Sequence, residues 1–307
     1  MLKRRVEFSL APAVTPSVAG SLVMTLVFLT LFLDGYARAQ VIPNGPETTI
    51  VAGSDGSATI TPSKVGQLPP PEIPTNERLE YQISWLGVPV ALLTMTTSPV
   101  SDKEDILKLT KDGFHPQSLL KLDCQARTNT YLETVFPIRV QLVSFLDPRS
   151  RNPRRFEAFI KRQQRRHESV EIFHTEKGEA FHQLPKGRSA TVAIGPATQD
   201  GLSLLYYVRT IPFRVGQEIP LEVSAAGRNW QLNSKIVRTG TVQIKNMKEW
   251  PAIAGEAELA NPLPFFGVKA LVWFSANQER IPLLATINSN VGPVTVVLTR
   301  RTAGEPL

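Results

Sequence analysis

Residues 77–87, ERLEYQISWLG, decide the fold class of this chain because their side chains alternate in character. The apolar positions of this stretch are Leu79, Tyr81, Ile83 and Trp85. Successive side chains of a β-strand point to opposite faces, so this alternation is typical of a strand with one buried face. A turn at residues 87–89, which contain Gly87, predicts a hairpin with a partner strand over residues 90–98.

The same pattern continues to residue 300. Short segments of strand-forming residues alternate with turn formers such as Gly, Pro and Asn, which is typical of an antiparallel sandwich or barrel. The predicted strands are residues 79–86, 90–98, 106–111, 139–146, 155–164, 168–175, 180–184, 218–224, 229–238, 268–275, 283–288 and 294–300. We therefore expect a mainly β fold, in which a large curved antiparallel sheet forms a half-open barrel or a sandwich.

One or two short helices are expected to pack on this sheet. Residues 200–209, DGLSLLYYVR, place an apolar stripe at helical spacing, formed by Leu202, Leu205, Tyr206 and Arg209. Asp200 can accept hydrogen bonds from the free N–H groups at the start of this helix. A weaker helical pattern covers residues 129–136 and ends at Pro137.

The N-terminal residues predict export. Basic residues at positions 3–5 precede the apolar run SLVMTLVFLTLFL at residues 21–33, and small residues follow before Gln40. This layout is typical of a secretory signal peptide, here residues 1–39, and places the protein in the periplasm or outside the cell. If the segment were retained, it would anchor the protein in the inner membrane, facing the periplasm, and we expect membrane contact only in that case.

Three further segments follow the predicted signal. Residues 40–75 are rich in Pro, Gly, Ser and Thr and are expected to form a disordered tether. Residues 76–300 are expected to fold as a single β-rich domain, and residues 301–307 as a flexible tail. Without residues 1–39 the chain keeps 30 basic and 25 acidic residues. This mildly basic charge favours anionic partners of the cell envelope over nucleic acid.

The sequence contains no familiar catalytic or cofactor-binding signature, so we predict no catalytic residue, cofactor or metal. The single cysteine, Cys124, is expected to be a buried residue on a strand. If residues 168–175 and 180–184 form a hairpin, His174 and His182 could approach one another. No third ligand is spaced to complete a zinc site, so both are expected to be surface residues.

A dense basic stretch offers a candidate binding site for an anion. Its candidate members are Arg154, Arg155, Lys161, Arg162, Arg165 and Arg166. On an extended strand, Lys161 and Arg165 would share one face, and Arg162 and Arg166 the other. Either the stretch is a solvated edge hairpin whose charges pair with Glu157, Glu168 and Glu171, or it clamps a phosphate or carboxylate.

Several segments, in this order and spacing, resemble the bacterial secreted family called domain of unknown function 3108. They are residues 77–87, residues 145–148 (FLDP) with residues 155–157 (RFE), residues 199–210 with 215–217 (VGQ), residues 273–275 (WFS) and residues 280–282 (RIP). The motif residues are Tyr81, Trp85, Gly87, Asp147, Pro148, Gln199, Asp200, Tyr206, Tyr207 and Gly216. The resemblance implies an extracytoplasmic β-rich protein and supplies no catalytic residues, and the motif residues also fit structural roles.

Three classes of function remain open at this stage. The first is a non-catalytic envelope protein whose curved sheet binds a lipid, a glycan or another envelope protein, and a lipid could enter an apolar cavity rimmed by residues 250–251 and 264–267. The second is an envelope hydrolase acting on wall or lipid material, for which Asp147, Glu157, Asp200 and His174 are the residues to watch. The third is a structural scaffold.

Overall fold

The computed structural model describes residues 72–183, 189–244, 249–260, 269–289 and 292–302. The predicted signal peptide and the predicted tether up to residue 71 lie outside the described residues, as do residues 264–267 of the expected rim. Residues 72–75 of the expected tether are described, and two of them, Ile73 and Thr75, are buried against the domain. The last strand runs to Thr302, two residues beyond the expected end of the domain, and residues 303–307 lie outside the description.

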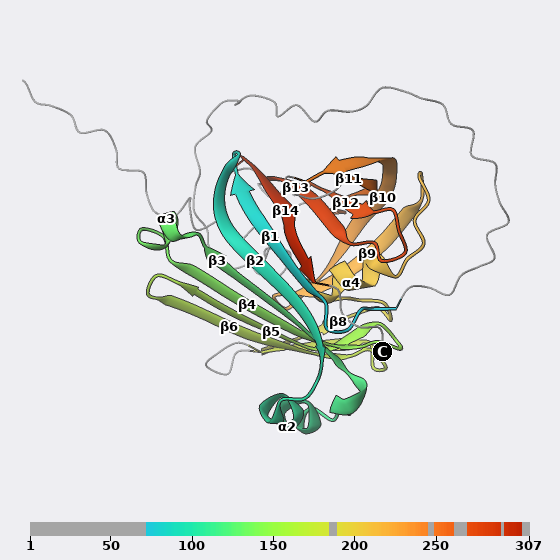
Figure 1. Ribbon diagram of the computed structural model, residues 1–307. Helices are drawn as coiled ribbons and strands as arrows, with labels where there is room; N and C mark the ends of the chain where they lie inside the picture. Colours follow the sequence, from blue (N-terminus) through green and yellow to red (C-terminus); the bar gives the residue numbers. More distant parts are fainter. Residues whose placement is uncertain (1–71, 184–188, 245–248, 261–268, 290–291, 303–307) are drawn as a thin grey trace, which may run out of the picture.

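Fourteen strands form one antiparallel sheet that curves into a nearly closed barrel (Figure 1). The first eight are β1 (Arg78–Trp85), β2 (Val88–Pro99), β3 (Leu120–Thr128), β4 (Ile138–Asp147), β5 (Asn152–Arg162), β6 (Arg165–His174), β7 (Glu179–Gln183) and β8 (Ser189–Ala193). The others are β9 (Glu218–Ala225), β10 (Arg228–Gln243), β11 (Glu249–Leu259), β12 (Lys269–Ser275), β13 (Pro282–Ser289) and β14 (Gly292–Thr302). The expected mainly β fold is confirmed.

The order of the strands in the sheet is β8-β7-β6-β5-β4-β3-β2-β1-β14-β13-β12-β11-β10-β9. The first and last strands of the chain therefore pair in the middle of the sheet, with Arg78 opposite Thr302 and Trp85 opposite Val294. Every other ladder joins strands that follow one another along the chain. The two ends of the sheet are β8 and β9.

Side chains and a short loop close the seam between β8 and β9. Asn229 Nδ2 donates to the carbonyl oxygen of Ala193 at 3.0 Å, and Glu222 Oε1 accepts from the Gly195 N–H at 2.9 Å. Gln199 forms an isolated parallel bridge with Val223. The loop thus satisfies part of the hydrogen-bonding edge of β9, which an open sheet would expose.

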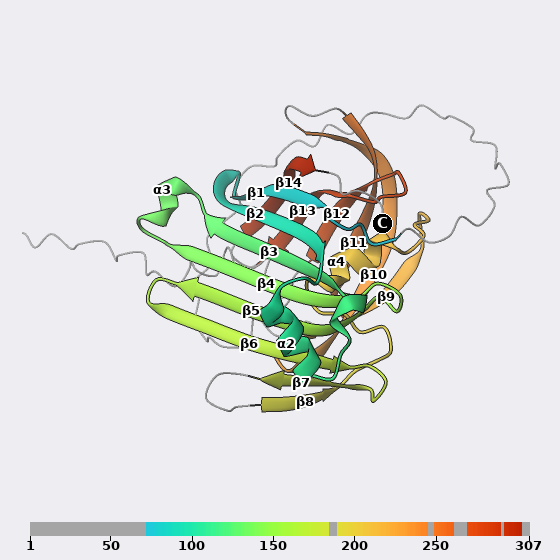
Figure 2. The same ribbon diagram turned by 60° about the horizontal axis from the view of Figure 1, so that its bottom comes forward.

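The sequence prediction is wrong at residues 106–111, which belong to helix α2 (Lys103–Lys111) rather than to a strand. Asp102 caps this helix by accepting from the N–H groups of Glu104 and Asp105. Six residues are too few to distinguish the alternation of a strand from the spacing of a helix. The capping side chain of Asp102 favours the helix here. Leu109 is fully buried against Val143 and Phe145, so α2 covers the outer face of the sheet near β4, as Figure 2 shows.

Three further short elements interrupt the strands. A single 3-10 turn, η1 (Pro116–Ser118), precedes β3, and α3 (Thr130–Glu133) joins β3 to β4. The third, α4 (Ser203–Arg209), lies within the curve of the sheet. The two helices expected at residues 129–136 and 200–209 are present but shorter.

Helix α4 connects two buried apolar clusters. Leu202 and Tyr206 belong to the main cluster, which gathers residues from β1–β7 and β10–β14. Tyr207 and Val208 pack instead against a second cluster, formed by β9 and other residues of β10. The expected stripe of the helix is therefore largely buried: Leu202, Tyr206 and Arg209 are buried, and Leu205 is half-buried. Filling the curve of the sheet with a helix gives both clusters a common neighbour and removes apolar surface from water.

Three strands were not predicted as such: β3, β8 and β11. Cys124 lies buried on β3, so its predicted environment is confirmed, and burial raises the pKa of its thiol to about 12. Trp250 and Pro251, expected at a rim, lie on β11, where Trp250 packs against the main cluster.

Candidate functional site

The basic stretch falls mainly at the turn between β5 and β6. We call Lys161, Arg162, Arg165 and Arg166 the basic tip. Lys161 lies directly opposite Arg166, and Arg162 opposite Arg165, across a turn at residues 163–164. Partners across a ladder share a face, so each face carries one like-charged pair. The expected pairing of faces is wrong because the turn interrupts the strand, and Gln163 there has a φ of 52°.

An acidic neighbour compensates part of this charge. Arg166 Nε lies 2.5 Å from Glu168 Oε1, and its guanidinium lies 4.8 Å from the centre of the Phe159 ring. Among the described residues, neither Lys161 nor Arg165 forms an ion pair with an acidic side chain. Like charges placed directly opposite one another destabilise a sheet, so the basic tip is an electrostatic cost to the fold.

The structure separates Arg154 and Arg155 from the basic tip. They lie seven or so residues away on β5, roughly 23 Å along the strand. Arg154 binds Asp147 and Glu176, both at 3.3 Å, and Arg155 binds Asp112 and Glu157 at 2.5 and 2.7 Å. The Arg155–Asp112 contact fixes the C-terminal end of α2, so these two arginines are structural.

The expected description of the basic stretch as an edge hairpin is only partly met. Strand β5 lies between β4 and β6, so it is not an edge strand, and the pairing of β6 with β7 begins only at Val170. Of the three glutamates expected to pair across strands, Glu157 and Glu168 bind arginines two residues away on their own strands. Glu171 pairs across to β7.

That cross-strand partner is His182, one of the two histidines expected to approach each other. His182 Nδ1 lies 3.0 Å from Glu171 Oε1, and both side chains are buried. His174 pairs instead with Glu179 in the ladder, about three residues or roughly 10 Å along the strand. The two imidazoles therefore do not meet, and His182 is not a surface residue. Among the described residues, no three His, Cys, Asp or Glu side chains gather as a metal would require.

Asp200 forms a buried polar contact at the start of α4. Its carboxylate accepts from the N–H groups of Leu202 and Ser203, both at 2.7 Å, which confirms the expected capping role. Ser144 on β4 donates its hydroxyl to the other carboxylate oxygen at 2.6 Å. Burial raises the pKa of Asp200 to about 6, although these hydrogen bonds oppose the shift.

We expect Asp200 to make stability depend on pH between about 4 and 6. Its folded pKa of about 6 exceeds the ordinary value of 3.8, so the folded state binds the proton more tightly. Protonated Asp200 therefore adds most to the free energy of unfolding below pH 4. This contribution, up to about 3 kcal/mol, is lost as the pH rises to 6 and above. The variant Asp200→Asn keeps the shape of the side chain but does not titrate, so its stability should not fall over this pH range. The measurement is urea unfolding of both proteins at several pH values; parallel curves would contradict the assignment.

The other motif residues occupy structural positions. Tyr81 donates its hydroxyl to the carbonyl oxygen of Pro282 at 3.0 Å, and Gln199 donates to the carbonyl oxygens of Arg151 and Ala197. Gly87 and Gly216 have φ angles of 80° and 87°, which side chains disfavour. Tyr206, Tyr207 and Trp85 pack against the apolar clusters, and Asp147 and Pro148 form the turn after β4.

The four residues considered for hydrolysis do not converge on one point, although Arg154 binds both Asp147 and Glu176, and Glu176 lies 3.5 Å from His174. Glu157 contacts Lys108 of α2 on the outer face, whereas Asp200 lies buried with Ser144. Asp147 accepts from the turn that follows it, which lowers its pKa against the effect of burial, and His174 stacks on Phe114. Among the described residues, no hydrogen bond or ion pair joins any two of the four.

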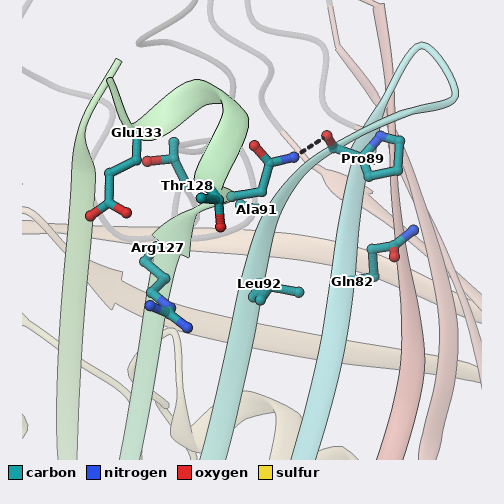
Figure 3. Close-up of a pocket in the computed structure, with 9 residues that line it drawn as sticks. Gln82, Pro89, Ala91, Leu92, Arg127, Thr128 and Glu133 are labelled. Carbon is teal, nitrogen blue, oxygen red and sulfur yellow. Dashed lines mark hydrogen bonds between the residues drawn. The ribbon is translucent and has the colours of Figure 1, made fainter. Parts of the chain in front are cut away.

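A small pocket lies beside α3 (Figure 3). Its volume is about 120 Å³, and its lining residues are Gln82, Pro89, Ala91, Leu92, Arg127, Thr128, Asn129, Thr130 and Glu133. Asn129 Nδ2 donates to the carbonyl oxygen of Pro89 across it, at 2.6 Å. Pockets for organic ligands usually exceed about 300 Å³, so this one does not accommodate the lipid expected from the sequence.

Sequence reasoning missed one buried ion pair. Glu77, just before β1, and Arg209, at the end of α4, form two hydrogen bonds of 2.7 and 3.0 Å. They are 132 positions apart, so no local pattern indicates the contact. The pair holds α4 against the start of the sheet, and Arg209 Nε also donates to the carbonyl oxygen of Glu279.

Comparison with known proteins identifies the fold without a function. A family model described as a protein of unknown function, DUF3108, matches residues 80–299. No curated protein matches the chain. A beta-barrel-like protein of domain of unknown function DUF1849 from Brucella abortus is 9% identical with a TM-score of 0.51, over 76% of this chain and 100% of that chain. A protein with a YmcC-like fold from Bacteroides fragilis is 10% identical with a TM-score of 0.34, over 75% and 98%.

Proposed function

The chain belongs to the DUF3108 family of proteins of unknown function, and from that premise we propose that it is an exported, non-catalytic binding protein of the cell envelope. Its ligand in this proposal is an anionic, phosphate-bearing envelope lipid, held at the basic tip. Export rests on the signal-like residues 1–39. Among the described residues, no helix has the length and apolar character needed to cross a bilayer.

The observation that carries the proposal is the pair of like-charged contacts at the basic tip. Two cross-strand pairs, Lys161 with Arg166 and Arg162 with Arg165, place four positive charges within six residues. Such pairs weaken a sheet, and a bound anion would offset this cost. Guanidinium groups bind phosphate oxygens through two parallel hydrogen bonds, which makes a phosphate monoester or diester the best matched anion.

The geometry favours binding at the tip over binding inside the barrel. The inner positions that lead to the tip, such as Ile138, Val140 and Ile160, are buried in the main cluster. The pocket at α3 is small and partly polar. A ligand at the tip needs no empty apolar interior, because its acyl chains can remain in a membrane or carrier while the protein binds the headgroup.

The test is calorimetric titration of the full chain, purified after export, with a soluble lipid. The probe is dihexanoyl phosphatidylglycerol below its micelle concentration, and dihexanoyl phosphatidylcholine is the neutral comparison. We expect binding of the first lipid only. Replacing Arg162 and Arg165 together by Gln should weaken binding about a hundredfold, because each substitution removes a charge-assisted hydrogen bond worth about tenfold.

The matched control is Arg78→Gln with Arg300→Gln, which also removes two positive charges. These two residues lie at the end of the β1–β14 ladder that is opposite to the basic tip. Both side chains are exposed there. The control should bind as the unmodified protein does. Equal binding of the neutral lipid, or equal weakening by the control, would overturn the proposed function.

A further inference from the structure

Three loops meet at one end of the sheet, the end that carries the basic tip. They are the β1–β2 turn, the α3 segment between β3 and β4, and the β5–β6 turn, which follow one another along one side of the sheet (Figures 1 and 2). Direct hydrogen bonds link them. Asn129 N–H donates to the carbonyl oxygen of Val90 at 2.9 Å, and Gln163 N–H donates to that of Pro137 at 3.1 Å.

Large apolar side chains are exposed on two of these loops. The exposed fractions are 58% for Leu86, 61% for Val88, 90% for Tyr131 and 60% for Val135. None of the four contributes to the buried clusters. Exposed apolar groups gathered at one end of a domain mark a surface that leaves water when it functions.

Positive charge surrounds the apolar positions of this surface. Residues 127–139 and 161–168 carry six basic and two acidic side chains, a net charge of +4. The basic ones are Arg127, Arg139 and the four residues of the basic tip. The β1–β2 turn, residues 85–90, has no charged residue. From β1 to β6, the apolar β1–β2 turn is followed by α3, whose apolar residues lie between Arg127 and Arg139 in the sequence, and then by the basic tip, over roughly 24 Å at ordinary strand spacing.

We propose that this end of the domain, the membrane rim, docks on the surface of an anionic bilayer. The membrane rim consists of Leu86, Val88, Tyr131, Val135 and the basic tip. The inference rests on the proposed function, because the basic tip supplies the contact with phosphate headgroups. It adds that the lipid is bound where it lies in the bilayer, with the four apolar side chains inserted at the level of the headgroups.

The composition of the rim fits a bilayer better than a protein partner. The centre of a protein interface is depleted of charged residues, whereas here Arg127 and Arg139 flank the apolar residues of α3 and the basic tip lies next to them. Tyrosine is favoured at membrane interfaces because its ring is apolar and its hydroxyl reaches water, and Tyr131 is almost fully exposed. Lys and Arg near an anionic surface add attraction that salt weakens.

The test is flotation of the full chain with large vesicles. One vesicle is phosphatidylcholine with about one third phosphatidylglycerol, and the other is phosphatidylcholine alone. Four proteins are compared: unmodified, Tyr131→Ser with Val135→Ser, Lys161→Gln with Arg166→Gln, and the apolar control Leu107→Ser with Val215→Ser. Leu107 and Val215 are 70% and 57% exposed but lie outside the membrane rim. The thermal unfolding midpoint of each variant verifies that it is folded.

The unmodified protein and the control should float with anionic vesicles only, and 0.5 M salt should release them. Loss of Lys161 and Arg166 should lower the partition coefficient roughly 30-fold, since each charge is worth about fivefold. Loss of Tyr131 and Val135 should lower it roughly tenfold through the apolar area withdrawn from the interface.

The outcomes separate this inference from the proposed function. If the protein binds soluble phosphatidylglycerol but does not float with anionic vesicles, the membrane rim is overturned and the proposed function stands. Flotation that Tyr131→Ser with Val135→Ser leaves unchanged also overturns the insertion. If neither the soluble lipid nor the vesicles are bound, both proposals fail.

Discussion

Replacing Glu77 with Ala is expected to lower the free energy of unfolding by about 3–5 kcal/mol, the usual cost of breaking a buried ion pair. The Glu77 side chain is 0% exposed and that of Arg209 5%, so the variant leaves a guanidinium buried without its counter-charge. Arg301, whose Nε lies 3.6 Å from Glu77, would then lie near Arg209 without the carboxylate between them. Urea unfolding followed by tryptophan fluorescence gives the change in midpoint.

The double variant Glu77→Leu with Arg209→Met separates the ion pair from simple packing. Replacing both partners removes the uncompensated charge, so we expect the double variant to be more stable than either single variant. Purely additive losses would show that the two side chains act independently. A single-variant loss below about 1 kcal/mol would mean that water or another group takes over the role of Glu77.

The second large effect is expected at Tyr206, the central side chain of α4. It is 1% exposed and lies in the main cluster, so Tyr206→Ala should cost about 3–5 kcal/mol through lost burial and the cavity left behind. Its hydroxyl has no hydrogen-bond partner among the described residues, and burial raises the pKa of the phenol. The variant Tyr206→Phe should therefore leave stability unchanged or slightly increased.

Tyr81→Phe is the matched comparison for the hydroxyl. Its hydroxyl donates to the carbonyl oxygen of Pro282, so its removal should cost about 1 kcal/mol. Thermal unfolding of the four proteins, including the unmodified one, ranks these effects. If Tyr206→Phe lowers stability more than Tyr81→Phe does, the Tyr206 hydroxyl must form a hydrogen bond in the folded protein, which would contradict this expectation.

Much of the fold follows from local patterns. Period-two alternation finds β1, β2 and most later strands, because each buries one face and exposes the other. Strand β3, residues LKLDCQART, alternates as regularly as β1 and could have been predicted. Residues 106–111 show the limit of a short window, because the cap at Asp102 lies just outside it.

The candidate site was only half predictable. Sequence shows that basic residues are dense at 149–166, but the two-residue turn and the ladder register decide which of them share a face. Register is set by pairing across the sheet and cannot be read from one strand. The same applies to Glu171 with His182, which face each other across the β6–β7 ladder, and to Glu77 with Arg209, which join segments far apart in the chain.

The position of the β1–β14 ladder has a consequence for how the domain folds. If β14 were joined directly to β1, the fourteen strands would form one continuous meander that starts at β9 and ends at β8. All ladders but one are therefore local, and the exception joins residues about as far apart as the domain allows, such as Arg78 and Thr302. Such a pairing carries the largest loop-closure cost, so two half-sheets can form early while their union waits for the final strand. A chain that emerges from its N-terminus first cannot complete this core until β14 has followed.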